Sequence, residues 1–196
     1  SLKSWPVNLL TDGAPSSVEV AGAEYEIRTD YRIGLQFERL MGSAIPPDEM
    51  ITRALILYYP VVPDDLEAAC ERLVWFYRCG HAAKAGGPKP ASPVRKVLSF
   101  EHDANLIFAA FMGDYGIDLE ASGLHWWKFR ALLDGLKSGN RIVEIMGYRA
   151  ADLSKLKGEE RQRMQRLQRE DAIPTSDEAQ QRIDAVTEAL MNGGKL

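Results

Sequence analysis

The sequence predicts a mainly α-helical fold: a compact helical domain with a small N-terminal β-hairpin and a projecting C-terminal helical segment. Apolar residues recur every three or four positions through most of the chain, which is the spacing of one side of a helix. Proline or a capping residue stands before most of these stretches, and glycine or proline follows them. With 196 residues, the chain is long enough to bury a substantial core.

Three parts are expected along the chain. Residues 1–17 are rich in proline, serine and turn-forming polar residues, which predicts an irregular segment. A helical core domain is expected over 18–148, and the glycine and proline residues of 80–93 predict a flexible loop within it. In 149–196 the apolar positions thin out, so we expect helices that cover an edge of the core or form an arm.

The elements are expected in chain order. Residues 18–27 alternate apolar and acidic side chains around Ala21 and Gly22, which predicts a hairpin. The helices that follow are bounded by capping residues, proline or glycine, and in the third of them Leu66 and Val74 are expected on the inward side. These helices are expected over 30–41, 46–60, 63–80, 103–115, 122–135, 140–147, 149–171 and 175–193.

Two adjacent tryptophans mark the helix expected from its cap at Ser122 to Gly135. At about 100° per residue, Trp126 and Trp127 point in different directions and cannot serve one face. A helix with two apolar surfaces contacts two neighbours, and both can lie inside its own fold. We expect Trp126 to pack in the core. Trp127 either packs in the core as well or contacts a partner, and it is the residue to mutate in order to test a partner.

Composition limits the class of protein. The net charge of −4 and the pI near 5.5 disfavour nucleic acid and anionic membrane surfaces as partners. Residues 155–169 carry a basic strip, but acidic residues are interleaved with it, and a solvated helix face is the favoured interpretation. No stretch approaches the roughly 18 apolar residues of a membrane span. Cys70 and Cys79 stand in no metal or disulfide motif, which favours a reducing intracellular compartment.

No arrangement of titratable residues predicts catalysis. His102 stands between Glu101 and Asp103, but adjacent side chains point apart, so we interpret the cluster as the charged start of a helix that Asp103 caps. Cys79 and His81 lack a third group and a rigid support. No phosphate-binding glycine motif occurs. We therefore expect no catalytic residue, no metal site and no cofactor, and a protein that is not an enzyme.

The central block resembles a known family. Residues 124–136 read LHWWKFRALLDGL, 145–149 read IMGYR, and 152–155 read DLSK. Together with FEHDANLIFAAF at 100–111 and YGIDL at 115–119, this pattern is similar to the phage gene-product-fifteen family of tailed bacteriophages and prophages. The resemblance implies a phage structural or assembly protein that is encoded in the tail module, near the tape-measure gene, and that is not an enzyme.

The leading expectation is a tail assembly protein in the cytoplasm of the bacterial host, acting as a chaperone for the tape-measure protein. The alternatives are a structural component that stays in the virion, at the tail or neck, and a host-directed or nucleic-acid-binding phage protein. A homo-oligomer is compatible with the sequence, and no membrane is expected as a partner. The residues expected to contact a partner are Trp127, Phe129, Arg130, Met164, Leu167, Ile183, Val186 and Leu190.

Overall fold

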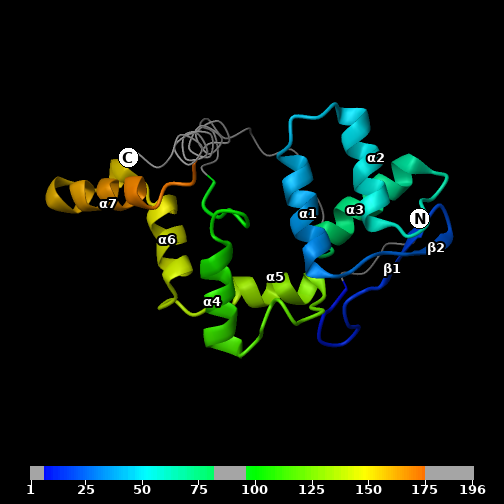
Figure 1. The fold of residues 1–196 in the computed structure, drawn as a ribbon, viewed down its shortest axis with the longest axis horizontal. Coiled ribbons are helices and arrows are strands. Elements are labelled where there is room, and N and C mark those ends of the chain that lie inside the picture. Colours follow the sequence, from blue (N-terminus) through cyan, green and yellow to red (C-terminus); the bar gives the residue numbers. More distant parts are fainter. Residues whose placement is uncertain (1–6, 82–95, 175–196) are drawn as a thin grey trace, which may run out of the picture. The chain divides into compact units, whose positions relative to one another are not determined.

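The computed structural model describes residues 7–81 and 96–174 of the chain (Figure 1). Contacts group the chain into two compact units: the first contains Ser1–Lys89 and Phe111–Leu136, and the second contains Pro90–Ala110 and Lys137–Leu196. The predicted division into an N-terminal segment, a core domain and C-terminal helices is a different partition and stays a prediction. Most of the predicted loop at 80–93 and the last predicted helix lie outside the described residues.

The first unit begins with the predicted hairpin. Strand β1 (Ser17–Val20) pairs antiparallel with β2 (Ala23–Glu26). Ala21 and Gly22 form the turn with φ angles of 50° and 83°, and a two-residue type I′ turn needs positive φ at both positions. One side of β1 is buried, and β1 contacts α3 (Leu66–Tyr77), so a helix supports the hairpin.

Three helices follow the hairpin: α1 (Tyr31–Met41), α2 (Pro47–Tyr58) and α3. Asp30 caps α1 by accepting from the backbone N–H of Arg32, and the side chain of Asp65 caps α3 in the same way. Helix α2 begins with Pro47, which has no backbone N–H. This costs no hydrogen bond, because an N–H at the first position of a helix has no partner inside the helix. Helix α1 packs on α2, and α2 packs on α3. All three helices were predicted.

The next two helices are α4 (Ala104–Tyr115) and α5 (Trp126–Asp134). The bounds of α4 agree with the prediction. The predicted start of α5 is wrong, because His125 rather than Ser122 is its N-cap. Ser122 belongs instead to a preceding turn, in which its N–H donates to the carbonyl of Asp118 at 2.9 Å.

In the second unit, α6 (Arg141–Ala150) is followed by a short 3-10 helix, η1 (Leu153–Lys155), and by α7 (Gly158–Glu170). Gly147, the predicted end of α6, lies inside that helix, where glycine costs only about 1 kcal/mol relative to alanine. Helix α7 contacts α6 and η1 but has no fully buried residue. The predicted class, mainly helical with an N-terminal hairpin and a C-terminal helical segment, is confirmed.

Aromatic rings from three helices form the core of the first unit. Phe129 of α5 stacks on Tyr31, Phe111 and Trp126 at centroid distances of 4.9, 5.1 and 5.8 Å. Each such pair adds about 0.5–1.5 kcal/mol beyond the burial of its surface. Helices α1, α4 and α5 therefore meet at one ring.

Two adjacent buried tyrosines are expected to respond in opposite ways to loss of their hydroxyl groups. Tyr59 donates its hydroxyl proton to the carbonyl of Ala69 at 2.9 Å, whereas the buried hydroxyl of Tyr58 has no hydrogen-bond partner among the described residues. We expect Tyr59→Phe to lower the free energy of unfolding by about 1 kcal/mol and Tyr58→Phe to leave it unchanged or raise it by up to about 1 kcal/mol. Urea unfolding of the two variants measures the difference, and an equal loss in both would contradict it.

Candidate partner-binding surfaces

The two tryptophans of α5 are both buried. Trp126 is 1% exposed and Trp127 is 3% exposed. Their indole N–H groups donate to successive carbonyls at the end of α3, from Trp126 to Tyr77 and from Trp127 to Phe76, both at 2.8 Å. Both tryptophans are thus bonded to the end of α3 inside the first unit, and Trp127 is a core residue in this structure rather than an exposed anchor.

The starts of α1 and α5 are joined by backbone hydrogen bonds. The N–H of Tyr31 donates to the carbonyl of Leu124 at 2.8 Å, and the N–H of Trp126 donates to the carbonyl of Thr29 at 2.7 Å. These are N–H groups that the first turn of a helix cannot satisfy by itself. The bridge therefore fixes the position of α5 against α1.

His125 connects the start of α5 to the N-terminal segment. Its Nδ1 accepts from the N–H of Trp127 at 3.0 Å, and its Nε2 lies 3.0 Å from the carbonyl oxygen of Pro15. Because a carbonyl can only accept, Nε2 carries the proton and the ring is neutral. Burial lowers the pKa of His125, the Pro15 carbonyl opposes this shift, and the charge of Lys128 adds to it.

The stability of the first unit is expected to fall as the pH drops below about 6.5, and His125 is the cause. In the unfolded chain the ring takes up a proton near its ordinary pKa of 6.5. In the folded chain the pKa is lower, so the ring is protonated only at a lower pH. The stability is therefore fully present above pH 6.5 and is lost as the pH falls toward the folded pKa, by at most about 1.4 kcal/mol per pH unit. Urea unfolding at several pH values between 8 and about 5 measures this loss.

Two asparagine variants test the assignment. His125→Asn keeps an acceptor at the N-cap but does not titrate, so the pH-dependent loss should shrink. His102→Asn, at an exposed histidine, should retain the loss. A loss that disappears only in the His102 variant would contradict the role of His125.

The other predicted contact residues lie in several environments. Phe129 is 1% exposed and belongs to the core. Arg130 is half-buried, with its guanidinium 5.6 Å from the centroid of the Trp126 ring. Met164 and Leu167 are half-buried on α7. Outside the described residues lie Ile183, Val186 and Leu190. The contact role of this set stays a prediction, and its two buried aromatic residues would have to leave the core to fulfil it.

An exposed apolar stripe runs along α3. Leu66 and Val74 are 53% and 42% exposed, so their predicted inward position is wrong. Half-buried Cys70 lies between them, and residues four apart share one side of a helix, so the three form the α3 stripe. The stripe faces outward because other residues occupy the buried side of the helix, namely Ala69, Leu73 and Phe76.

A second exposed stripe lies on α4. Phe108 and Met112, one turn apart, are 38% and 42% exposed and form the α4 stripe. The residues beside them on the exposed side are small or uncharged: Asn105, Ala109 and Gly113. The buried side of α4 contains Ile107, Ala110 and Phe111. The exposed stripe was not predicted, although apolar residues on all sides of a helix are a signal for two contact surfaces.

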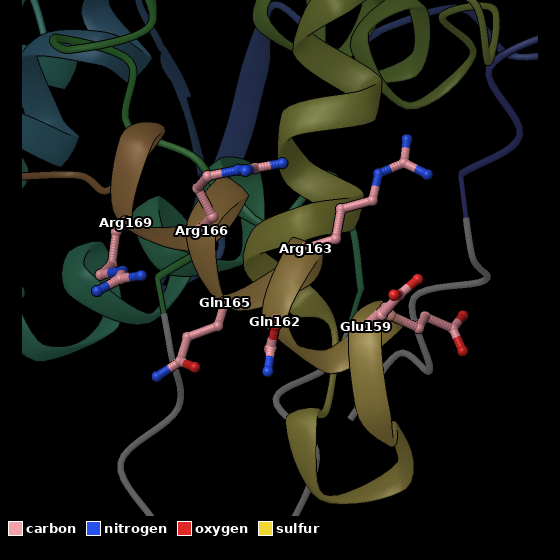
Figure 2. A pocket seen from close by; sticks show the side chains of 7 residues that line it. Glu159, Gln162, Arg163, Gln165, Arg166 and Arg169 are labelled. Atoms are coloured by element: carbon pink, nitrogen blue, oxygen red, sulfur yellow. The ribbon is translucent and has the colours of Figure 1, made fainter.

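A third surface is polar and lies on α7. Seven of its residues line a hollow of about 850 Å³: Glu159, Glu160, Gln162, Arg163, Gln165, Arg166 and Arg169 (Figure 2). The lining side chains of Figure 2 all extend from this one helix. The hollow contains no apolar side chain, in contrast to the α3 and α4 stripes.

A buried ion pair holds the second unit together. Asp103 accepts hydrogen bonds from the two terminal nitrogens of Arg149, at 2.7 and 3.0 Å, and from the N–H of Ser99 at 2.9 Å. Arg149 also donates to the carbonyls of Val97 and Asp171. The predicted capping of α4 by the Asp103 side chain is thus corrected, because its carboxylate binds these partners. Burial raises the pKa of Asp103, but the hydrogen bonds from Arg149 and Ser99 outweigh it, so the pKa lies below its ordinary value.

Other chemistry-bearing groups give no concentrated site in the described part of the chain. Among those residues, no three histidine, cysteine or acidic side chains are grouped so that they could hold a metal ion. Burial raises the pKa of Cys79 to about 11, so its thiol is protonated at neutral pH. None of the described helices has both the length and the apolar character needed to cross a membrane.

The comparison of the sequence with protein families gives the class of the protein, a phage structural or morphogenesis protein. The matching family model is that of the bacteriophage Gp15 protein, and it matches residues 10–173. Because this match spans most of the chain, the protein belongs to the bacteriophage Gp15 family, as the central sequence block predicts. No curated protein and no solved structure matches the chain.

Proposed function

We propose that this protein is a non-enzymatic phage tail assembly protein that acts in the bacterial host cytoplasm as a chaperone for the tape-measure protein. The observation that carries the proposal is the pair of exposed apolar stripes on α3 and α4. With 24 basic and 28 acidic residues, the chain has enough charged side chains to cover its helices, so an uncharged face such as that of α4 favours a contact surface. Family membership supports a role in phage morphogenesis.

The stripes suit a helical apolar partner. The side chains of each stripe repeat at a spacing of four residues, which is the spacing with which one helix lies along another. Burying the exposed part of each large side chain contributes on the order of 1 kcal/mol. A tape-measure protein is long and hydrophobic, so it would offer such helices before the tail tube forms around it. The non-enzymatic part of the proposal is supported by the protonated thiol of Cys79 and by the ion pair that occupies Asp103.

Co-expression with the tape-measure protein of the same phage, followed by pull-down, tests the proposal. The expected results are a stable complex and a larger soluble fraction of the tape-measure protein. Phe108→Ser/Met112→Ser and Leu66→Ser/Val74→Ser should each weaken the complex about tenfold or more. The matched control is Ile51→Ser/Ile56→Ser, which removes two apolar side chains of α2 that are 48% and 59% exposed and belong to neither stripe.

Two results would overturn the proposal. One is the absence of both a complex and a gain in solubility. The other is a stoichiometric amount of this protein in purified phage particles, measured by mass spectrometry, because a chaperone leaves before the particle is complete. That second result would favour the alternative, a structural component of the tail or neck.

A further inference from the structure

Helix α7 has a side that is fixed to the second unit. The side-chain amide of Gln168 donates to the carbonyls of Tyr148 and Ala151, both at 2.8 Å. Met164 and Leu167 are half-buried on the same side. The opposite side, which we call the outer face, therefore has a defined orientation, because α7 cannot rotate without breaking these contacts.

The outer face presents three exposed arginines. Arg163 and Arg169 form no ion pair with any described residue, and Arg166 makes only a long contact, 3.9 Å from its Nε to Glu170. Gln165 stands between Arg163 and Arg166, Gln162 precedes Arg163, and two glutamates stand at the start of the helix. The face is thus polarised along the helix, acidic at its first turn and basic over the rest.

The spacing of the arginines matches a row of acidic residues on another helix. Arg163, Arg166 and Arg169 follow one another at intervals of three residues, a rise of about 4.5 Å per step. Carboxylates three or four residues apart on a partner helix are spaced by about 4.5–6 Å, so the two rows can lie side by side. Guanidinium groups bind carboxylates through two parallel hydrogen bonds, which favours arginine over lysine at such a face.

Nucleic acid fits the outer face less well. DNA carries one charge per roughly 1.7 Å of its axis, and a long duplex would meet Glu159 and Glu160 as well as the arginines. Helix α7 has no aromatic residue on which a base could stack. The net charge of the chain, −4, also repels a long polyanion. A short acidic segment would contact only the positively charged arginines of the outer face.

We propose that the outer face of α7 binds an acidic helical segment of a partner protein, with carboxylates on successive turns facing Arg163, Arg166 and Arg169 and a basic residue facing Glu159 and Glu160. The tape-measure chaperone proposal uses the apolar stripes, so this surface is independent of it. The apolar stripes and the outer face would allow the protein to bind one apolar and one acidic partner.

Calorimetric titration of the full chain with a designed peptide tests this surface. The probe is an alanine-rich helical peptide with three glutamates on successive turns followed by two lysines, and its control has glutamine in place of each glutamate. The glutamate peptide should bind at low salt, bind more weakly as salt increases, and bind about tenfold or more tightly than the glutamine peptide.

A matched pair of triple variants locates the site. Arg163→Gln/Arg166→Gln/Arg169→Gln should weaken binding about tenfold or more, whereas Lys155→Gln/Lys157→Gln/Arg161→Gln removes the same charge outside the hollow and should weaken it less than about threefold. Circular dichroism checks the folding of both variants, and Arg163→Gln alone serves if the triple variant does not fold. Equal weakening by both triple variants, or tighter binding of a DNA duplex than of the glutamate peptide, would overturn the proposal.

Discussion

Replacing Gly34 of α1 with alanine is expected to destabilise the first unit by about 3 kcal/mol or more. A Cβ atom at this position would lie 2.5 Å from two ring carbons of Trp126, Cδ2 and Cζ3, well inside the contact distance of two carbons. The ring cannot withdraw, because it stacks on Tyr77 at 5.4 Å and on Phe129 at 5.8 Å. Its N–H is also held by the carbonyl of Tyr77. Urea unfolding followed by circular dichroism measures the change.

Gly113 provides the matched control for this substitution. It also lies inside a helix of the described chain, α4, but an added Cβ atom would meet nothing within 4 Å. Gly113→Ala should therefore raise the free energy of unfolding by about 0.5–1 kcal/mol, because alanine loses less conformational freedom than glycine in a helix. If Gly34→Ala proved as harmless, the close packing of α1 on Trp126 would be incorrect.

Replacing Arg149 with methionine is expected to destabilise the second unit by about 3–5 kcal/mol. The side chains of Arg149 and Asp103 are 4% and 1% exposed, so the substitution leaves a carboxylate buried without its counter-charge. It also leaves the carbonyls of Val97 and Asp171 without the guanidinium that bonds to them. Thermal unfolding followed by circular dichroism measures the loss.

A rescue and a control accompany this variant. Adding Asp103→Asn to Arg149→Met removes the unpaired charge and should recover part of the loss. Arg141→Gln breaks an ion pair with Asp171 in which the arginine side chain is 51% exposed, and it should cost less than about 1 kcal/mol. Equal effects of Arg141→Gln and Arg149→Met would contradict the dominant role of the buried pair.

The same ion pair predicts a response to acid. The pKa of Asp103 in the folded chain lies below its ordinary value of 3.8, so the contribution of the pair is fully present above that pH and is lost as the pH falls through the folded pKa. Arg149→Met removes the hydrogen bonds that lower the pKa, while the burial that raises it remains. Acid unfolding of this variant should therefore begin at a higher pH than in the parent protein.

Local signals in the sequence predicted most of the helices. Asp30 and Asp65 cap α1 and α3 through hydrogen bonds to residues two or three positions away, and a local pattern is sufficient to find such caps. The start of α5 depends on distant contacts. His125 caps it with a neutral ring whose other nitrogen bonds to Pro15, 110 residues earlier. Histidine is not a usual N-cap, and no short stretch of sequence reveals that partner.

The contact surfaces were harder to predict, because exposure depends on what packs on a helix. The apolar pattern of α3 is compatible with Leu66 and Val74 on either side, and only the packing of the other helices decides between them. The sequence likewise shows Asp103 at a helix start but not Arg149, 46 residues later, as its partner. The basic strip was visible from the sequence, whereas its division into a fixed side and an outer face needed the contacts of Gln168.

The placement of the indole rings makes intrinsic fluorescence a selective reporter. Among the described residues, Trp75, Trp126 and Trp127 all belong to the first unit, and Trp126 and Trp127 are almost fully shielded from water. Their emission therefore reports the melting of that unit, whereas far-ultraviolet dichroism averages over the helices of both. If the units unfold separately, the two signals will give different midpoints, and Arg149→Met will shift the dichroism curve while the emission curve stays in place.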